Sequence, residues 1–142
     1  AIISTIDYDL IIYYDLYNRI WDCCKVDNHN NLKELLLNNN IDLEMKNKEG
    51  WTALIIAAYN GSINCVKLLI EKGANINATN YNLTSVIMYA KDNAINTKNE
   101  DLLKYILNFN PCLVHKDVFG KSVIDWAKDQ DSGIYKLLSS HL

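Results

Sequence analysis

The stretch that decides the fold is residues 50–77, which read GWTALIIAAYNGSINCVKLLIEKGANIN. Thr52 can cap a short helix that Gly61 ends, and Gly73 can stop a second, longer helix in left-handed geometry. The second helix carries an apolar stripe with helical spacing, formed by Ile63, Val66, Leu69 and Ile70. The stretch therefore predicts a helix-turn-helix unit. Such a unit needs stacked neighbours because it cannot bury its apolar face alone.

The same unit recurs on the C-terminal side of this stretch. Asn47 and Asn80 lie 33 residues apart, each just before a turn. Ser85 likewise stands 33 residues after Thr52, at the start of the next short helix. The second helix of this unit matches at an offset of 37 residues instead. The extra residues fall within the polar stretch 91–99, so we expect a lengthened loop between the two helices.

Weaker copies flank these two units. Gly120 and Ser122 repeat the turn and the cap at an offset of 70 residues, ahead of a short final helix. On the N-terminal side, Cys23 and Cys24 stand where the central unit has two alanines. Atypical end units are typical of stacked repeats, because a terminal unit must present a polar outer face.

The first residues carry a helical pattern of their own. Helical spacing links Ile6, Leu10, Tyr14 and Tyr17. It predicts a helix over about residues 6–16 that caps the open N-terminal end, with the Tyr8, Tyr13, Tyr14 and Tyr17 cluster facing the core. A remnant of a further repeat is the alternative for the helix, and a docking surface or a phosphorylation target is the alternative for the tyrosines.

The period and the unit together resemble the ankyrin repeat over about residues 18–142. The central unit has the family's residues at Gly50, Thr52, Leu54, Ala57, Ala58, Gly61, Val66, Leu69, Gly73, Ala74, Asn75 and Asn77. The family's Thr-Pro-Leu-His start is not kept, since the three starts here read TALI, SVIM and SVID. The resemblance thus implies that the family's histidine network is missing, and we expect apolar packing in its place.

The resemblance implies an all-α ankyrin-repeat solenoid of about four helix-turn-helix repeats with short hairpin loops. We expect one domain over residues 1–142. Its expected parts are a cap helix (1–17), a degenerate repeat (18–46), a full repeat (47–79), a repeat with a long inter-helix loop (80–116) and a capping repeat (117–142).

The resemblance also implies a protein-binding scaffold without enzymatic activity, which holds its partner on the hairpin tips and the concave face of the inner helices. Carried over by position, the candidate partner-binding residues are Lys48, Glu49, Trp51, Tyr59, Asn60, Tyr81, Asn82, Thr84, Asp92 and Lys121. A structural or spacer module of a longer chain, with no dedicated binding face, is the alternative. Trp51 and Tyr81 stand in polar turns, where an aromatic ring either contacts a partner or packs on its own loop. For Phe119 we favour local packing.

Asn77 occupies the position at which the family's asparagine can be hydroxylated by a cytosolic oxygenase. In a eukaryotic cell Asn77 is therefore the candidate for this modification. The alternative is that its side chain serves only as a hydrogen-bond partner within the loop.

Composition narrows the function classes further. The net charge is −3 and Arg19 is the only arginine, so no basic stripe for nucleic acid is expected. No apolar run approaches the roughly 20 residues that span a bilayer. Cys112 and His115 have zinc-like spacing, but the other possible ligands fall on different units. We therefore expect no metal, no cofactor and a chain that is monomeric on its own.

The cysteines and the overall composition indicate where the protein works. All four cysteines fall inside helical or hairpin patterns, which favours free thiols in a reducing compartment and thus a cytoplasmic protein. Enrichment in Asn, Ile and Lys is typical of AT-rich genomes, including those of viruses and intracellular pathogens whose repeat proteins engage host factors. A host-interaction role, in the cytoplasm of a host cell, is therefore a hypothesis.

Overall fold

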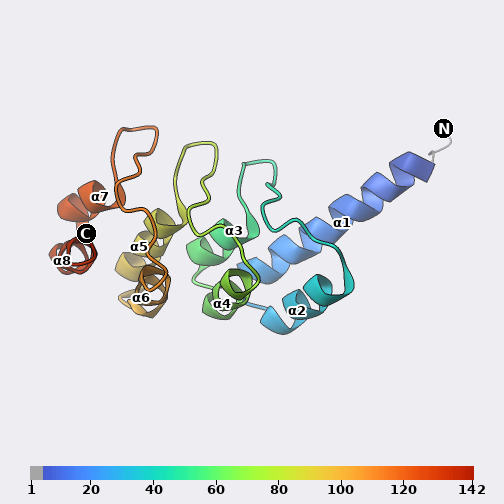
Figure 1. Cartoon of the computed structure of the whole chain (residues 1–142), viewed down its shortest axis with the longest axis horizontal. Helices are drawn as coiled ribbons and strands as arrows, with labels where there is room; N and C mark the ends of the chain where they lie inside the picture. Colours follow the sequence, from blue (N-terminus) through green and yellow to red (C-terminus); the bar gives the residue numbers. More distant parts are fainter. Residues whose placement is uncertain (1–4) are drawn as a thin grey trace.

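The computed structural model describes the backbone of residues 5–142 and the side chains from residue 8 onward. Within this range the chain forms eight helices: α1 (Thr5–Lys25), α2 (His29–Asn38), α3 (Ala53–Asn60), α4 (Ile63–Glu71), α5 (Val86–Thr97), α6 (Asp101–Leu107), α7 (Val123–Gln130) and α8 (Ser132–Ser139). Figure 1 shows consecutive helices pairing and the pairs stacking along one axis, with three long loops projecting on one side. The expected all-α solenoid is confirmed.

The central unit folds as its sequence predicts. The Thr52 hydroxyl accepts a hydrogen bond from the Ile55 amide at 3.3 Å and caps α3. Gly61 ends α3 with a φ of +70°, and Gly73 adopts a φ of +94° just after α4. The Ala74 amide then donates to the Leu69 carbonyl at 3.0 Å, which closes the helix end.

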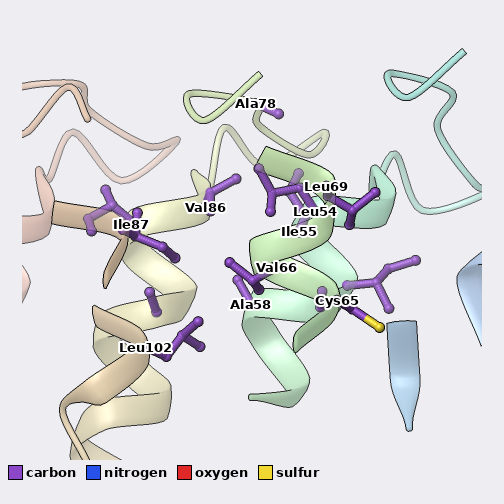
Figure 2. Packing of buried hydrophobic residues seen from close by; sticks show 14 of the residues in the cluster. Leu54, Ile55, Ala58, Cys65, Val66, Leu69, Ala78, Val86, Ile87 and Leu102 are labelled. Atoms are coloured by element: carbon purple, nitrogen blue, oxygen red, sulfur yellow. The ribbon is translucent and has the colours of Figure 1, made fainter. Parts of the chain in front are cut away.

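The core runs along the stack through the inner helices. Every side chain from Ala53 to Ala58 in α3 is buried, because α3 packs against both α1 and α5. Figure 2 shows apolar side chains of α3 and α4 filling the space toward α5, which contributes Val86 and Ile87. Small Ala57 and Ala58 allow this close approach, and each buried leucine or isoleucine contributes about 2 kcal/mol.

Apolar packing replaces the missing histidines at two of the three repeat starts. Ile55 and Met88 are both buried in the core, as expected. At the third start, Asp125 instead caps its own helix: its carboxylate accepts from the Ser122 amide at 2.9 Å, and the Ser122 hydroxyl accepts from the Asp125 amide at 3.1 Å.

The prediction of a lengthened loop in the third repeat is wrong. Helix α5 has 12 residues where α3 has 8, so the extra residues lengthen the inner helix by about one turn. The polar stretch forms a helix with one buried face: Lys91 and Ala94 are buried about one turn apart, among polar neighbours in the sequence. The helix ends only at Thr97, and the residue after it, Lys98, adopts a left-handed φ of +58°.

The prediction of a separate cap helix ending near residue 16 is also wrong. Helix α1 continues to Lys25, so the cap and the first inner helix are one rod, which Figure 1 shows extending past the first loop. No glycine or proline interrupts this stretch, and buried Tyr17, Ile20 and Cys24 continue the helical spacing. Residues 1–4 of the expected cap, and the side chain of Ile6, lie outside the described part.

The N-terminal tyrosines do not face the core as expected. Tyr17 is buried, but Tyr8, Tyr13 and Tyr14 are exposed, as is Leu10. The other helices cover only the C-terminal half of α1. The helical spacing of apolar side chains continues into the N-terminal half, where no described element packs against them.

Candidate functional site

Three loops, residues 39–52, 72–85 and 108–122, are built around one polar side chain each. We call them the first, second and third loops. Asn47 Oδ1 accepts hydrogen bonds from the Glu49 and Trp51 amides at 3.0 and 2.9 Å. Asn80 does the same for the amides two and four residues on, and so does Asp117. These bonds hold each tip in a fixed turn, which leaves the intervening side chains directed outward.

The turns require a left-handed residue at equivalent positions. Gly50 has a φ of +82° and Gly120 a φ of +73°, which glycine adopts without strain. In the second loop the same position is held by Leu83, at a φ of +59°. Its side chain is 45% exposed, so an apolar group is displayed at a tip at the cost of backbone strain.

Neighbouring loops are tied to one another. The Val118 amide donates to the Asn82 carbonyl at 3.1 Å, and His115 Nε2 donates to the Leu83 carbonyl at 2.8 Å. Between the first and second loops, Gly50 lies so close under Tyr81 that a Cβ there would be 2.7 Å from the ring. The three tips therefore form one continuous ledge and not three independent loops.

Lower links also join the second loop to its neighbours. Glu44 Oε2 accepts from the Asn75 amide at 3.0 Å, and Asn77 Oδ1 accepts from the Cys112 amide at 2.8 Å. Asn77 is exposed, but its carboxamide links two repeats and does not serve its own loop alone.

An aromatic cluster lies where the first loop meets the inner helices. Trp51 lies with its ring centroid 5.2 Å from that of Tyr59 in α3 and 4.8 Å from that of Tyr89 in α5. Tyr59 and Tyr89 are 5.5 Å apart, and Asn80 Nδ2 donates to the Tyr89 hydroxyl at 2.8 Å. Burial raises the pKa of Tyr89. Trp51 is half-buried between the two tyrosines, while Tyr59 is 55% exposed, so this cluster offers an open aromatic face.

A second cluster joins α5 to α7. The Lys91 side chain is buried, pairs with Asp92 at 2.6 Å, and donates to Gln130 Oε1 at 2.7 Å. Trp126 donates from Nε1 to Asp117 Oδ2 at 2.7 Å, and Lys121 Nζ lies 4.4 Å from the centre of the Trp126 ring. Of these side chains, all but Lys121 line one shallow groove.

That groove has a volume of about 250 Å³, and Thr84, Tyr89 and Phe119 also line it. Burial acts to raise the pKa of Asp117, but hydrogen bonds from the Trp126 ring and from the amides of Lys121 and Phe119 lower it below its usual value. Asp117 is therefore an anion held in place by its neighbours, and it can shape the groove without changing charge near neutral pH.

The structure gathers most of the predicted residues along one edge. Lys48, Glu49, Tyr59, Asn60, Tyr81 and Asn82 are exposed, while Trp51, Thr84, Asp92 and Lys121 are half-buried. Thr84 and Asp92 share the groove described above. Asn60 stands apart: it lines a different hollow with Asn93 at the far end of α3, and its Nδ2 donates to the Ile56 carbonyl of its own helix.

Tyr89 and Trp126 are central to this surface but were not among the predicted site residues. Both lie in inner helices, where a repeat pattern assigns aromatic side chains to the core. Tyr89 stands 33 residues after Ile56, a buried position of the central unit, so the repeat pattern gives no signal for a surface role. The Lys91 contact with Gln130 joins residues 39 apart in sequence and has no local signal.

The four cysteines are free. Cys23, Cys24 and Cys65 are buried where α1 meets α4, and Cys112 is exposed. A hydrogen bond with Cys65, together with burial, raises the pKa of Cys24 well above its usual value. Among the described side chains, those of residues 8–142, no group of three or more His, Cys, Asp or Glu is arranged to hold a metal ion.

No helix of the described part is both long and apolar enough to cross a membrane. The fold and its displayed loop tips define a helical repeat scaffold. The chain belongs to the ankyrin-repeat family: residues 20–117 match the family description "Ankyrin repeats (3 copies)". Ankyrin repeats generally mediate protein–protein interactions, and proteins of this family are typically scaffolds and not enzymes.

Several curated proteins are similar to parts of the chain. An ankyrin repeat protein of Acanthamoeba polyphaga mimivirus is 37% identical over 68 residues, which is 45% of this chain and 12% of that protein. Delta-latroinsectotoxin-Lt1a of Latrodectus tredecimguttatus is 53% identical over 47 residues, 33% of this chain and 4% of the toxin. BRCA1-associated RING domain protein 1 of Caenorhabditis elegans is 31% identical over 91 residues, 64% of this chain and 12% of that protein. The chain thus spans only a small part of these relatives.

Proposed function

We propose that the protein recognises a partner protein with the concave face of its inner helices and the tips of its loops. The residues assigned to this surface are Lys48, Glu49, Trp51, Tyr59, Tyr81, Asn82, Thr84, Asp92 and Lys121, together with Tyr89, Phe119 and Trp126. Asn60, predicted with them, is assigned to the rim because it lines a separate hollow.

The observation that carries the proposal is the aromatic cluster that crosses two repeats. Trp51, Tyr59 and Tyr89 contact one another, yet Tyr59 remains 55% exposed. Tyr81 is 67% exposed on the adjacent tip. Tyrosine and tryptophan are enriched among the residues that dominate interface energetics, and an aromatic face left open in a packed stack fits that role.

The proposed mechanism is recognition by a preformed surface. Asn47, Asn80 and Asp117 fix the tips, and the bonds between Val118 and Asn82 and between His115 and Leu83 fix the loops to one another. A partner that docks on such a ledge loses little conformational freedom in this chain, so more of the contact energy appears as affinity.

A double variant, Tyr59→Ala with Tyr81→Ala, tests the proposal. Both side chains are mostly exposed, although their rings also pack on Trp51, Tyr89 and Gly50, so we expect only a small fall in melting temperature and at least tenfold weaker binding to a partner captured by the wild type. Phe109→Ala is the matched control, since Phe109 is an exposed aromatic that packs on Tyr105 of α6, away from the loop tips. Unchanged binding by the double variant would overturn the assignment.

The alternative function is a structural or spacer module with no dedicated binding face. It predicts that the tyrosines matter only for packing, so the double variant would lose stability while every interaction of the full-length protein persisted. Trp51 is less suitable for separating the two cases, because its ring packs between Tyr59 and Tyr89 and its removal also disturbs the stack.

A host-interaction role is the finer form of the proposal. Two observations support it: the enrichment in Asn, Ile and Lys, which is typical of AT-rich genomes, and the similarity to a viral ankyrin repeat protein. Capture from a lysate of a candidate host, with the Tyr59 and Tyr81 double variant in parallel, tests this role. Equal capture by both proteins would count against it.

We also propose that the chain is a cytoplasmic monomer of four repeats, in which the N-terminal part of α1 extends the first repeat. Three buried free thiols support a reducing compartment. Asn77 is the proposed hydroxylation site, because it is exposed at the family position. Intact-mass analysis after co-expression with an asparaginyl oxygenase should show one added oxygen atom in the wild type and none in an Asn77→Ala variant.

A further inference from the structure

A groove of about 430 Å³ lies between α1 and the tip of the first loop. Tyr14, Asn18 and Trp21 form its helical wall, and Lys46, Asn47 and Lys48 form the opposite wall. No residue of this groove other than Lys48 belongs to the partner-binding set predicted from the sequence. The groove is nevertheless continuous with that surface, because Lys46 Nζ lies 5.8 Å from the centre of the Tyr81 ring.

The charge of the groove is one-sided. Its lining holds two ammonium groups and no carboxylate, although the whole chain has a net charge of −3. Neither Lys46 nor Lys48 forms an ion pair with any residue of the described part. The nearby Glu44 carboxylate is engaged by the Asn75 amide. The charged side chains that line the groove are therefore both cationic, and no carboxylate of the described part pairs with them.

The helical wall is aromatic. Trp21 is only 7% exposed and packs on buried Tyr17, with their ring centroids 5.9 Å apart, so it forms a fixed base. Tyr14 is 60% exposed and forms the rim. An apolar side chain that packs on an aromatic wall of this kind is bound favourably, and anions are bound favourably by the lysines opposite.

We infer that this groove binds an acidic segment of the partner protein. Carboxylates of the segment pair with Lys46 and Lys48, and an apolar side chain between them rests on Tyr14 and Trp21. The inference depends on the proposed function and adds the chemistry of the partner to it. Nucleic acid is the less favoured occupant, because two lysines on a net-negative chain fall short of the basic stripe that a phosphate backbone needs.

Selection from a random dodecapeptide library displayed on phage tests this inference without a known partner. We expect peptides selected on the wild type to be enriched in Asp and Glu around one large apolar residue. A Lys46→Glu, Lys48→Glu double variant should bind these peptides roughly tenfold more weakly. Lys33→Glu on exposed α2 is the matched control and should bind them as the wild type does.

A second measurement locates the peptide. In a nuclear magnetic resonance titration with a selected peptide, the Trp21 indole and the amides of residues 46–48 should shift most, and raising the salt concentration should weaken the binding.

The inference is overturned if the selected peptides are neutral or basic, if they bind the lysine double variant equally well, or if single-stranded DNA competes for the groove more effectively than they do. The proposed function is tested separately. A partner that is lost with the Tyr59 and Tyr81 variant but kept with the Lys46 and Lys48 variant would refute the groove and leave protein recognition standing.

Discussion

Leu83 occupies a backbone position that its counterparts in the other two loops give to glycine. A φ of +59° lowers the stability of the fold by about 1 kcal/mol or more when the residue has a side chain. The leucine at this position is nevertheless half-exposed. The repeat pattern predicted the turn but not this residue, because a leucine in a turn reads as a departure from the pattern. A strained backbone that holds an apolar side chain in an exposed position agrees with a loop tip that contacts a partner.

Truncating Leu83 in two ways measures this strain. Leu83→Gly should be about 1 kcal/mol more stable than Leu83→Ala, because only alanine retains the penalty of a Cβ at positive φ. At Leu37 in helix α2 the order should reverse, since glycine is the poorer helix former. Urea unfolding of the four variants measures both differences. Equal stability of the two Leu83 variants would mean that the left-handed conformation is not held in solution.

The raised pKa of Tyr17 predicts how the stability of the fold changes at alkaline pH. Burial and a hydrogen bond with Tyr13 raise the pKa of Tyr17 from 10.0 to about 12. The folded state therefore keeps this proton where the unfolded chain has lost it, so the stabilisation is complete below pH 10 and is lost as the pH rises toward 12.

The Tyr17→Phe variant isolates this contribution. The fall in unfolding free energy between pH 10 and 12 should be shallower in the variant than in the wild type. At neutral pH the variant should be destabilised by about 1 kcal/mol, because the Asp42 amide, which donates to the Tyr17 hydroxyl at 2.9 Å, loses its acceptor. Parallel pH profiles for the two proteins would contradict the buried-phenol account.

At the scale of elements, the sequence predicts the helices of the central unit correctly and misjudges the two irregular ones. Helices α1 and α5 both run on through stretches interpreted as boundaries. Neither stretch contains a glycine or proline, and polar residues alone do not end a helix. In α5, Lys91 also contacts Gln130 in the next repeat, 39 residues away, and no local pattern signals that contact.

Removing the Lys91 side chain tests whether this contact joins α5 to α7. Lys91→Ala should destabilise the fold by about 2 kcal/mol, because Gln130 loses its buried donor and the apolar part of the lysine leaves a void beside Trp126. Lys104→Ala on the exposed side of α6 should change stability by less than about 0.5 kcal/mol. Thermal and urea unfolding measure both, and equal effects would argue against a packed link between α5 and α7.

Gly50 and Gly120 test whether the loops form one ledge. Both have positive φ, but a Cβ at Gly50 would meet the Tyr81 ring at 2.7 Å, whereas nothing lies within 4 Å of one at Gly120. Gly50→Ala should therefore cost about 1 kcal/mol more than Gly120→Ala, since it also forces Tyr81 off the first loop. Equal costs in urea unfolding would mean that the two tips are not in contact.

At the scale of the whole molecule, the repeat period predicts the solenoid because each unit buries its face only against the next. The same logic predicts which edge displays side chains, and most of the candidate residues lie on it. It does not predict how those residues pair. The Trp51, Tyr59 and Tyr89 cluster and the groove beside Lys46 each combine two elements, so they emerge only when the units are stacked.

Amide hydrogen exchange of the chain with and without its captured partner tests the central claim most directly. Protection on binding should appear at the three tips, residues 47–51, 80–84 and 117–121, and at the end of α3 around Tyr59. The outer helices α2, α4 and α6 should exchange as in the free chain. Protection concentrated on those outer helices, with the tips unchanged, would contradict recognition through the loop tips and the inner helices.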